Sequence, residues 1–153
     1  MKKIKEVVVV LVLCILFGGV AYHTLERGWY VGGVVLALST LPLIAAKLCR
    51  LNMTRMIPDM VFGAMDTGLL TIPAIAGGTL FGVLGAIVGS VIGDSITDGI
   101  AGFFEGSIAE WLRSKGIEES RLPLSSALGK MSGCLLGSGL VLILATLIGV
   151  RMG

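Results

Sequence analysis

Long apolar runs dominate the chain, and each is close to the roughly 20 residues that cross a bilayer as a helix. Their approximate bounds are 5–22, 29–48, 60–76, 79–100 and 131–150. Of the 153 residues, 55% are hydrophobic and only 14% are charged, and the mean hydropathy of +0.97 exceeds that of soluble globular domains. We therefore predict an all-α, polytopic transmembrane helix bundle of about five spans, forming a single domain over residues 1–153.

Lysine and arginine residues are divided unevenly between the two sides that these spans define. Nine lie on the side of the N-terminus and of the loops at about 49–59 and 113–123, whereas only Arg27 and Arg151 lie on the other side. Basic residues accumulate on the cytoplasmic side of membrane proteins. We expect a multi-pass protein of the cell (inner) membrane, with the N-terminus cytoplasmic and the C-terminus outside. The positions of the basic residues on the cytoplasmic side account for the net charge of +2. We therefore expect the lipid bilayer as the partner and do not expect nucleic acid.

The pair Gly77-Gly78 is the strongest turn signal between Pro58 and Ser114, and it predicts a tight hairpin of the third and fourth spans. Folding the chain at this pair places Asp59 level with Asp98. It also places Asp94 roughly 7 Å closer to the cytoplasm than Asp66, at about 1.5 Å of rise per residue.

Glycines recur along one face of the predicted fourth span. At about 100° per residue they form a narrow stripe, a small-xxx-small pattern that allows two helix backbones to approach closely. The stripe contains Gly78, Gly82, Gly85, Gly89 and Gly93. We predict glycine-zipper packing along it and a homo-oligomer, because small membrane bundles often build a pathway between subunits.

Carboxylates in apolar spans are the main functional signal in the sequence. A charged side chain at the bilayer centre costs at least about 2.5 to 3.5 kcal/mol, so intramembrane acids usually face water, a cation or a base. Asp66, Asp94 and Asp98 are the predicted metal ligands, with Asp59 and Glu105 as a cation vestibule. Asp94, Asp98 and Glu105 should point about 160° away from the glycine stripe. Such oxygen ligands suit Mg²⁺ or Ca²⁺ as a transported or bound ion.

These observations favour a channel or transporter for cations, most plausibly divalent metals, over an enzyme. The main alternative is a structural or assembly protein that does not transport, is held by the glycine zipper, and pairs its acids with Lys47, Arg50 or Lys130. A lesser alternative is an Mg²⁺-dependent enzyme acting on a lipid-linked phosphate at the cytoplasmic face. The motifs typical of nucleotide, zinc-protease and serine-hydrolase sites are absent from the sequence, and the single histidine, His23, is expected at the membrane interface.

Overall fold

The computed structural model describes residues 2–27, 30–114 and 122–150, with side chains excepted at positions 2, 102, 104–109 and 111–113. The described chain is all α, with no strand among these residues. Its elements in order are α1 (Lys2–Arg27), α2 (Val31–Leu38), α3 (Thr40–Leu48), the 3₁₀ helix η1 (Met53–Met56), α4 (Ile57–Ser114) and α5 (Pro123–Leu147). The sequence prediction of an all-α chain is confirmed.

Four of the described helical segments are long and apolar enough to cross a membrane, judged by length and composition. They cover Lys3–Arg27, Val31–Leu48, Met53–Ala101 and Pro123–Leu147. The surface of the described chain carries many exposed large aliphatic and aromatic side chains, as expected where lipid rather than water surrounds a bundle. The apolar helices therefore indicate a membrane protein.

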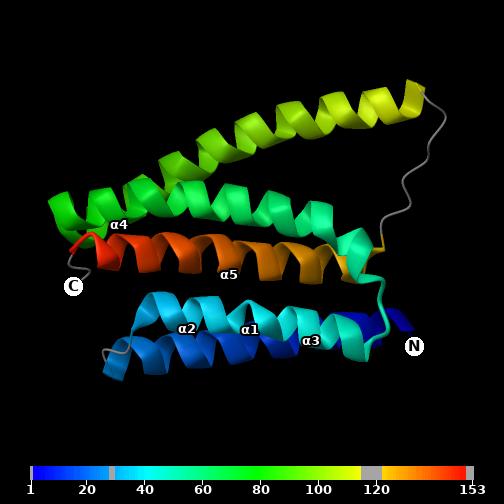
Figure 1. Cartoon of the computed structure of the whole chain (residues 1–153), viewed down its shortest axis with the longest axis horizontal. Helices are drawn as coiled ribbons and strands as arrows, with labels where there is room; N and C mark the ends of the chain where they lie inside the picture. The colour runs from blue at the N-terminus through cyan, green and yellow to red at the C-terminus, as the bar shows by residue number, and fades with distance from the viewer. Residues whose placement is uncertain (1, 28–29, 115–121, 151–153) are drawn as a thin grey trace.

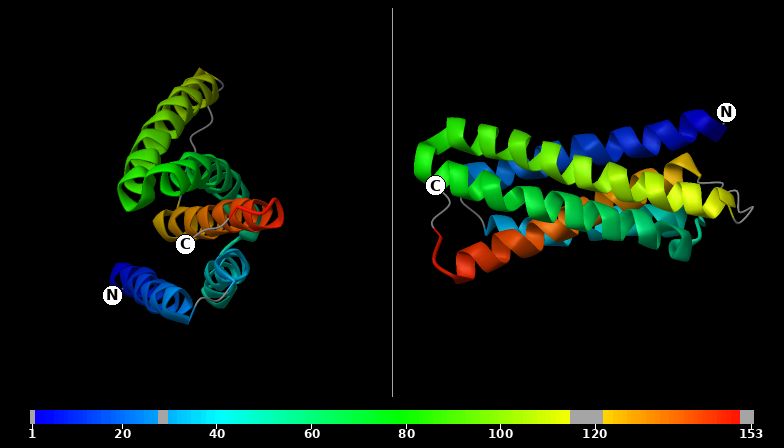
Figure 2. Two further views of the ribbon diagram at one scale, coloured as in Figure 1. Left: turned by 90° about the vertical axis from the view of Figure 1, so that its left-hand side faces the viewer. Right: turned by 90° about the horizontal axis from the view of Figure 1, so that it is seen from above.

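Helix α5 is the central element of the bundle. It contacts α1, α2, α3, η1 and α4, and it lies between α4 on one side and α1 to α3 on the other (Figures 1 and 2). Pro123 occupies the first turn of α5, where its missing N–H leaves no backbone bond unmade. A buried apolar cluster joins α5 to its neighbours through Leu124 and Leu128, which pack with Leu13, Ala46 and Met56.

Helix α4 is a helical hairpin within one long segment. Its backbone leaves helical geometry only at Gly82, with φ 66° and ψ −150°, and the two parts then run side by side in opposite directions (Figure 1). We call residues 57–81 limb one and residues 83–114 limb two. The predicted turn at Gly77-Gly78 is therefore wrong by about one helical turn. Residues with a Cβ rarely adopt this backbone conformation, which explains why the reversal lies at a glycine.

The predicted second span is divided into two helices. The break lies at Ser39, three residues before Pro42, which cannot donate a backbone hydrogen bond within a helix. Ser132 of α5 is fully buried, and its hydroxyl donates to the carbonyl oxygen of Ser39 over 2.7 Å. This bond satisfies a polar side chain inside an apolar bundle and joins α5 to the break.

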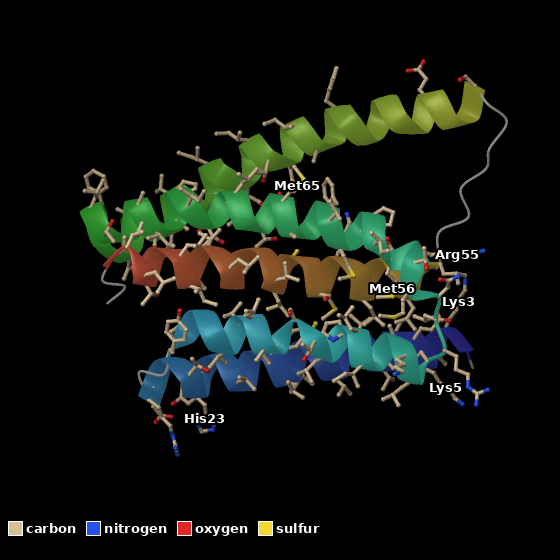
Figure 3. All side chains as sticks on the ribbon, viewed as in Figure 1. Lys3, Lys5, His23, Arg55, Met56 and Met65 are labelled. Atoms are coloured by element: carbon tan, nitrogen blue, oxygen red, sulfur yellow. The ribbon has the colours of Figure 1, made fainter. Side chains whose placement is uncertain are left out.

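Charged side chains gather at the ends of the bundle. Lys3, Lys5 and Arg55 lie at the end where α1 begins, and His23 lies at the opposite end (Figure 3). His23 is exposed, with Nδ1 3.6 Å from Oε2 of Glu26.

Candidate functional site

The two limbs of α4 approach one another closely near their shared turn. A Cβ added to Gly85 would overlap the carbonyl oxygen of Gly77, and one added to Gly89 would overlap that of Pro73. At Gly93 it would lie 2.8 Å from Cγ of Pro73 and 3.2 Å from Cα of Leu70. Side chains as small as a single methyl group would therefore force the limbs apart at these positions.

The other two members of the predicted glycine stripe have different surroundings. A Cβ added to Gly78 would lie 3.3 Å from Cβ of Ala86, across the hairpin. Around Gly82 no atom lies within 4 Å of the added Cβ, because this residue forms the turn. Gly82 thus provides backbone conformation and takes no part in the close approach.

The register of the limbs explains the position of the acidic residues. The facing pairs, such as Gly77 with Gly85 and Pro73 with Gly89, are centred on position 81. In this register the counterpart of Asp66 is position 96, midway between Asp94 and Asp98. One carboxylate oxygen from each of these three aspartates lies within 4.8 Å of the others.

One sequence-based expectation about these acids is wrong, and the error has a physical cause. The predicted 7 Å offset between Asp66 and Asp94 came from the misplaced turn, and moving the reversal to Gly82 brings Asp66 level with the acidic pair. Asp94 and Asp98 were also expected opposite the packed glycine face. They are exposed, as that position implies, and one carboxylate oxygen of each still lies within 4.8 Å of one of Asp66.

Like charges make this acidic cluster costly unless something neutralises it. Two unit charges 4.8 Å apart repel by about 0.9 kcal/mol in water and by about 3.5 kcal/mol at an effective dielectric constant of 20. One oxygen of Asp66, Oδ1, is buried and accepts no hydrogen bond from any group in the described structure. The cluster therefore has unused acceptor capacity and excess negative charge.

The basic partners required by the structural ion-pair alternative are not in place. Among the described residues, no lysine or arginine nitrogen lies within 4.0 Å of Asp66, Asp94 or Asp98. Lys130 instead places its ammonium 4.8 Å from the ring centre of Phe62, a cation–π arrangement. Lys47 and Arg50 are exposed near the end of α3.

A largely apolar cavity of about 350 Å³ lies beside the cluster, between the limbs. Phe62, Asp66 and Leu69 line it from limb one, and Thr97 and Ile100 line it from limb two. Thr97 is buried, and its hydroxyl donates to the carbonyl oxygen of Asp94 over 3.1 Å. Asp66 thus connects the acidic cluster to a space within the hairpin.

The predicted vestibule residues lie elsewhere or outside the described side chains. Asp59 is 5% exposed and faces α5, where a Cβ added to Gly129 would lie 3.0 Å from the Cβ of Asp59. Position 105 belongs to α4, and the side chain of Glu105 lies outside the described residues. Residues 115–121 of the predicted loop 113–123 also lie outside the description.

A second set of close glycine contacts was missed from the sequence. On α5, a Cβ added to Gly133 would overlap the carbonyl oxygen of Met60, and one added to Gly137 would overlap that of Ala64. Together with Gly129 these residues recur every four positions, which is the same small-xxx-small pattern. This spacing alone could have predicted that α5 packs closely on another helix.

Comparisons with known proteins provide no relative for this chain. No protein-family model matches it, and no curated protein or solved structure does either. The functional argument therefore depends on the geometry of the acidic cluster.

Proposed function

We propose that the protein is an oligomeric channel or transporter for cations, and that Asp66, Asp94 and Asp98 form its cation site. The observation that carries this proposal is the convergence of three carboxylates from two antiparallel limbs, with no described base within 4.0 Å of them. A bound metal cation would neutralise such a cluster within an apolar segment, and a binding site for one is the simplest use of it.

The chemistry of the cluster favours a divalent metal ion. Carboxylate oxygens are hard ligands that suit Mg²⁺ and Ca²⁺, and three of them outweigh the charge of a single divalent ion. Mg²⁺ usually retains several waters in protein sites, whereas Ca²⁺ accepts more ligands in a less regular geometry. The exposed positions of Asp94 and Asp98 leave room for water in either coordination shell.

The depth of the cluster supports a role within the membrane. Asp66 and Asp98 are each 16 residues from Gly82, which corresponds to about 24 Å along a helix. If the turn lies at one edge of a hydrocarbon core about 30 Å thick, the carboxylates lie inside the core near its other edge. A cation bound there has entered the apolar part of the bilayer from the side of the N-terminus.

The two limbs of α4 also support five passages through the membrane, with glycine-zipper packing inside the hairpin. Cysteine labelling tests this topology in a variant that lacks the three native cysteines. We expect Asn52→Cys, in the exposed connection before η1, to react only from the cytoplasmic side, and Glu26→Cys to react only from outside. Labelling of Asn52→Cys from outside would show that the chain has the opposite orientation.

Exposure of Asp94 and Asp98 supports a homo-oligomer. In an isolated chain these carboxylates would face lipid inside the hydrocarbon core, where a charge is unfavourable, although less so near the edge than at the bilayer centre. Placing the same face toward a water-filled axis shared between subunits removes that cost. The glycines of the hairpin already pack within one chain, so the subunit contact would use other residues of limb two.

Flux into proteoliposomes is the direct test. We expect uptake of Mg²⁺ or Ca²⁺ by the parent protein and a loss of about tenfold or more in Asp94→Asn and Asp98→Asn, which keep side-chain shape but remove charge. Glu110→Gln is the matched control, because this exposed acid lies on the same limb about 18 Å beyond Asp98. Its flux should equal that of the parent protein.

Melting temperature measured with and without Mg²⁺ or Ca²⁺ separates this proposal from the structural alternative. A bound ion stabilises the folded state by an amount that grows with its concentration, about 2.7 kcal/mol at 100 times the dissociation constant. Three results together would exclude cation transport and leave a structural role for the acids. They are an absence of flux in the parent protein, a melting temperature that does not change when cations are added, and destabilised asparagine variants.

A further inference from the structure

A second amphipathic space lies at the end of the bundle where α1 and α5 begin. This groove, about 590 Å³ in volume, separates the first turns of α1 from those of α5. Its wall on α1 is a stripe at helical spacing, formed by Lys3, Glu6, Val7, Val10 and Leu11. Its wall on α5 is formed by Leu122, Pro123, Leu124 and Ala127.

The groove is polar only at its outer end. Lys3 and Glu6 provide both of its charges, and the remaining lining side chains are apolar. Lys3 lies at the tip of the bundle (Figure 3), and Leu11 lies about 12 Å deeper along α1 at 1.5 Å per residue. The lining thus changes from charged to apolar in the same direction as the bilayer itself.

Two described charges, Lys3 and Glu6, lie at the mouth of the groove. Among the described residues neither Lys3 nor Glu6 has an ion-pair partner within 4.0 Å, although they are one helical turn apart. The N-terminus of α5 borders the same mouth, and no side chain caps it. Its first N–H groups and the helix dipole add positive potential there. One end of the groove therefore offers a site for an anion beside a site for a cation.

We propose that this groove binds a phospholipid with a phosphate and a primary ammonium in its headgroup, as in phosphatidylethanolamine. Lys3 and the N-terminus of α5 bind the phosphate, Glu6 accepts hydrogen bonds from the ammonium, and an acyl chain lies along Val7, Val10 and Leu11. The separate positive and negative charges favour this occupant over an anionic lipid, which would leave Glu6 facing negative charge. The proposal does not depend on cation transport.

Lipid retention tests the proposal on the full-length protein. The protein is exchanged into nanodiscs of phosphatidylethanolamine, phosphatidylcholine and phosphatidylglycerol in equal amounts, then extracted gently into detergent. Bound lipid is counted by native mass spectrometry. We expect phosphatidylethanolamine to be enriched over both other lipids, since phosphatidylcholine has no N–H donor and phosphatidylglycerol has no ammonium.

Charge-removing variants assign the site. Glu6→Gln should reduce this enrichment by about tenfold, the factor that corresponds to losing about 1.4 kcal/mol of headgroup interaction. Lys3→Gln should instead reduce retention of all three lipids, because each of them carries the phosphate. Lys5→Gln is the matched control, because Lys5 is exposed on the same turn of α1 but does not line the groove. Val7→Trp, which fills the groove, should reduce retention of all three lipids while the melting temperature confirms that the variant is folded.

Three results would overturn the proposal. Equal retention of the three lipids would show that the groove does not select a headgroup, and enrichment of phosphatidylglycerol would show that Glu6 has no role. Lys3→Gln and Glu6→Gln behaving like Lys5→Gln would place any bound lipid elsewhere. Recovery of a lipid-free dimer that Val7→Trp dissociates would assign the groove to a second copy of the chain.

Discussion

Limb one of α4 packs against two neighbours in different ways, and the difference separates a scaffold from a site. Toward α5 the close contacts continue from Gly129 to Gly137, and a partly buried hydroxyl pair joins the helices, with Thr71 donating to Ser138 over 3.0 Å. Toward limb two the close contacts end at Gly93, and the acidic cluster and its cavity follow.

This contrast separates a closely packed helix interface from the more open part of the hairpin. The close contacts from Gly129 to Gly137 leave no room for water or ions between the backbones there, so this part of the α4–α5 interface holds the helices together. The hairpin is held at one end by small residues and opens at the other, where Asp66 meets Asp94 and Asp98. A cation bound between the limbs would join their open ends.

Gly133→Leu should have the largest effect, because it breaks the scaffold. The leucine would have to displace the backbone of Met60 at the centre of the α4–α5 interface. We expect the free energy of unfolding to fall by about 3 kcal/mol, the upper part of the range for overpacked cores. Chemical denaturation in detergent micelles measures the change. Gly18→Leu is the control, since nothing lies within 4 Å of a Cβ at Gly18, and a similar loss in both variants would contradict the proposed scaffold.

Gly89→Leu should have a smaller and more local effect. It separates limb two from Pro73 and leaves the contacts of α5 intact, so we expect a loss of about 1 to 3 kcal/mol. Spin labels at the exposed positions Met65 and Ile96 should move apart in this variant. Gly99→Leu is the control on the same limb, because no atom lies within 4 Å of its added Cβ. An unchanged distance distribution in Gly89→Leu would contradict the close approach of the limbs.

Asp66→Asn should have the smallest effect on stability, and its sign is the informative result. Without divalent cations, removing one of three mutually repelling carboxylates should stabilise the protein by about 1 kcal/mol, since solvent screens the exposed members. With Mg²⁺ or Ca²⁺ present, the variant should lack the increase in melting temperature that we expect for the parent protein. Destabilisation in chelator would instead indicate a basic partner for Asp66.

The helical class and the grouping of Asp66, Asp94 and Asp98 could be predicted from the sequence, because the length of an apolar run and the carboxylates inside it are local properties. The turn was misplaced because Gly77-Gly78 resembles a loop signal, whereas Gly77 provides close contact with Gly85 and a lone Gly82 makes the reversal. Moving the centre of the hairpin from Gly77-Gly78 to position 81 shifts the facing partner of each limb-one residue by about seven positions, which corresponds to about 10 Å along limb two.

One pattern in the sequence indicates which face of limb one meets limb two. Asp66, Leu70, Pro73 and Gly77 recur at helical spacing, so Asp66 lies on the face of limb one that meets limb two. The position of Asp59 was not accessible in this way, because its burial depends on Gly129 of α5, far along the chain. Contacts between distant segments require the fold itself.

The reversal at Gly82 also has a consequence for synthesis. Residues Met53–Ala101 form one apolar helical stretch of 49 residues, with no charged residue near its turn to mark a boundary for the insertion machinery. Limb one leaves the ribosome first, before Asp94 and Asp98 have been synthesised. These two residues follow Asp66 by about 30 positions, in limb two. We expect the hairpin to enter the bilayer as one unit, so that a cation available during translation lowers the cost of inserting all three acids together.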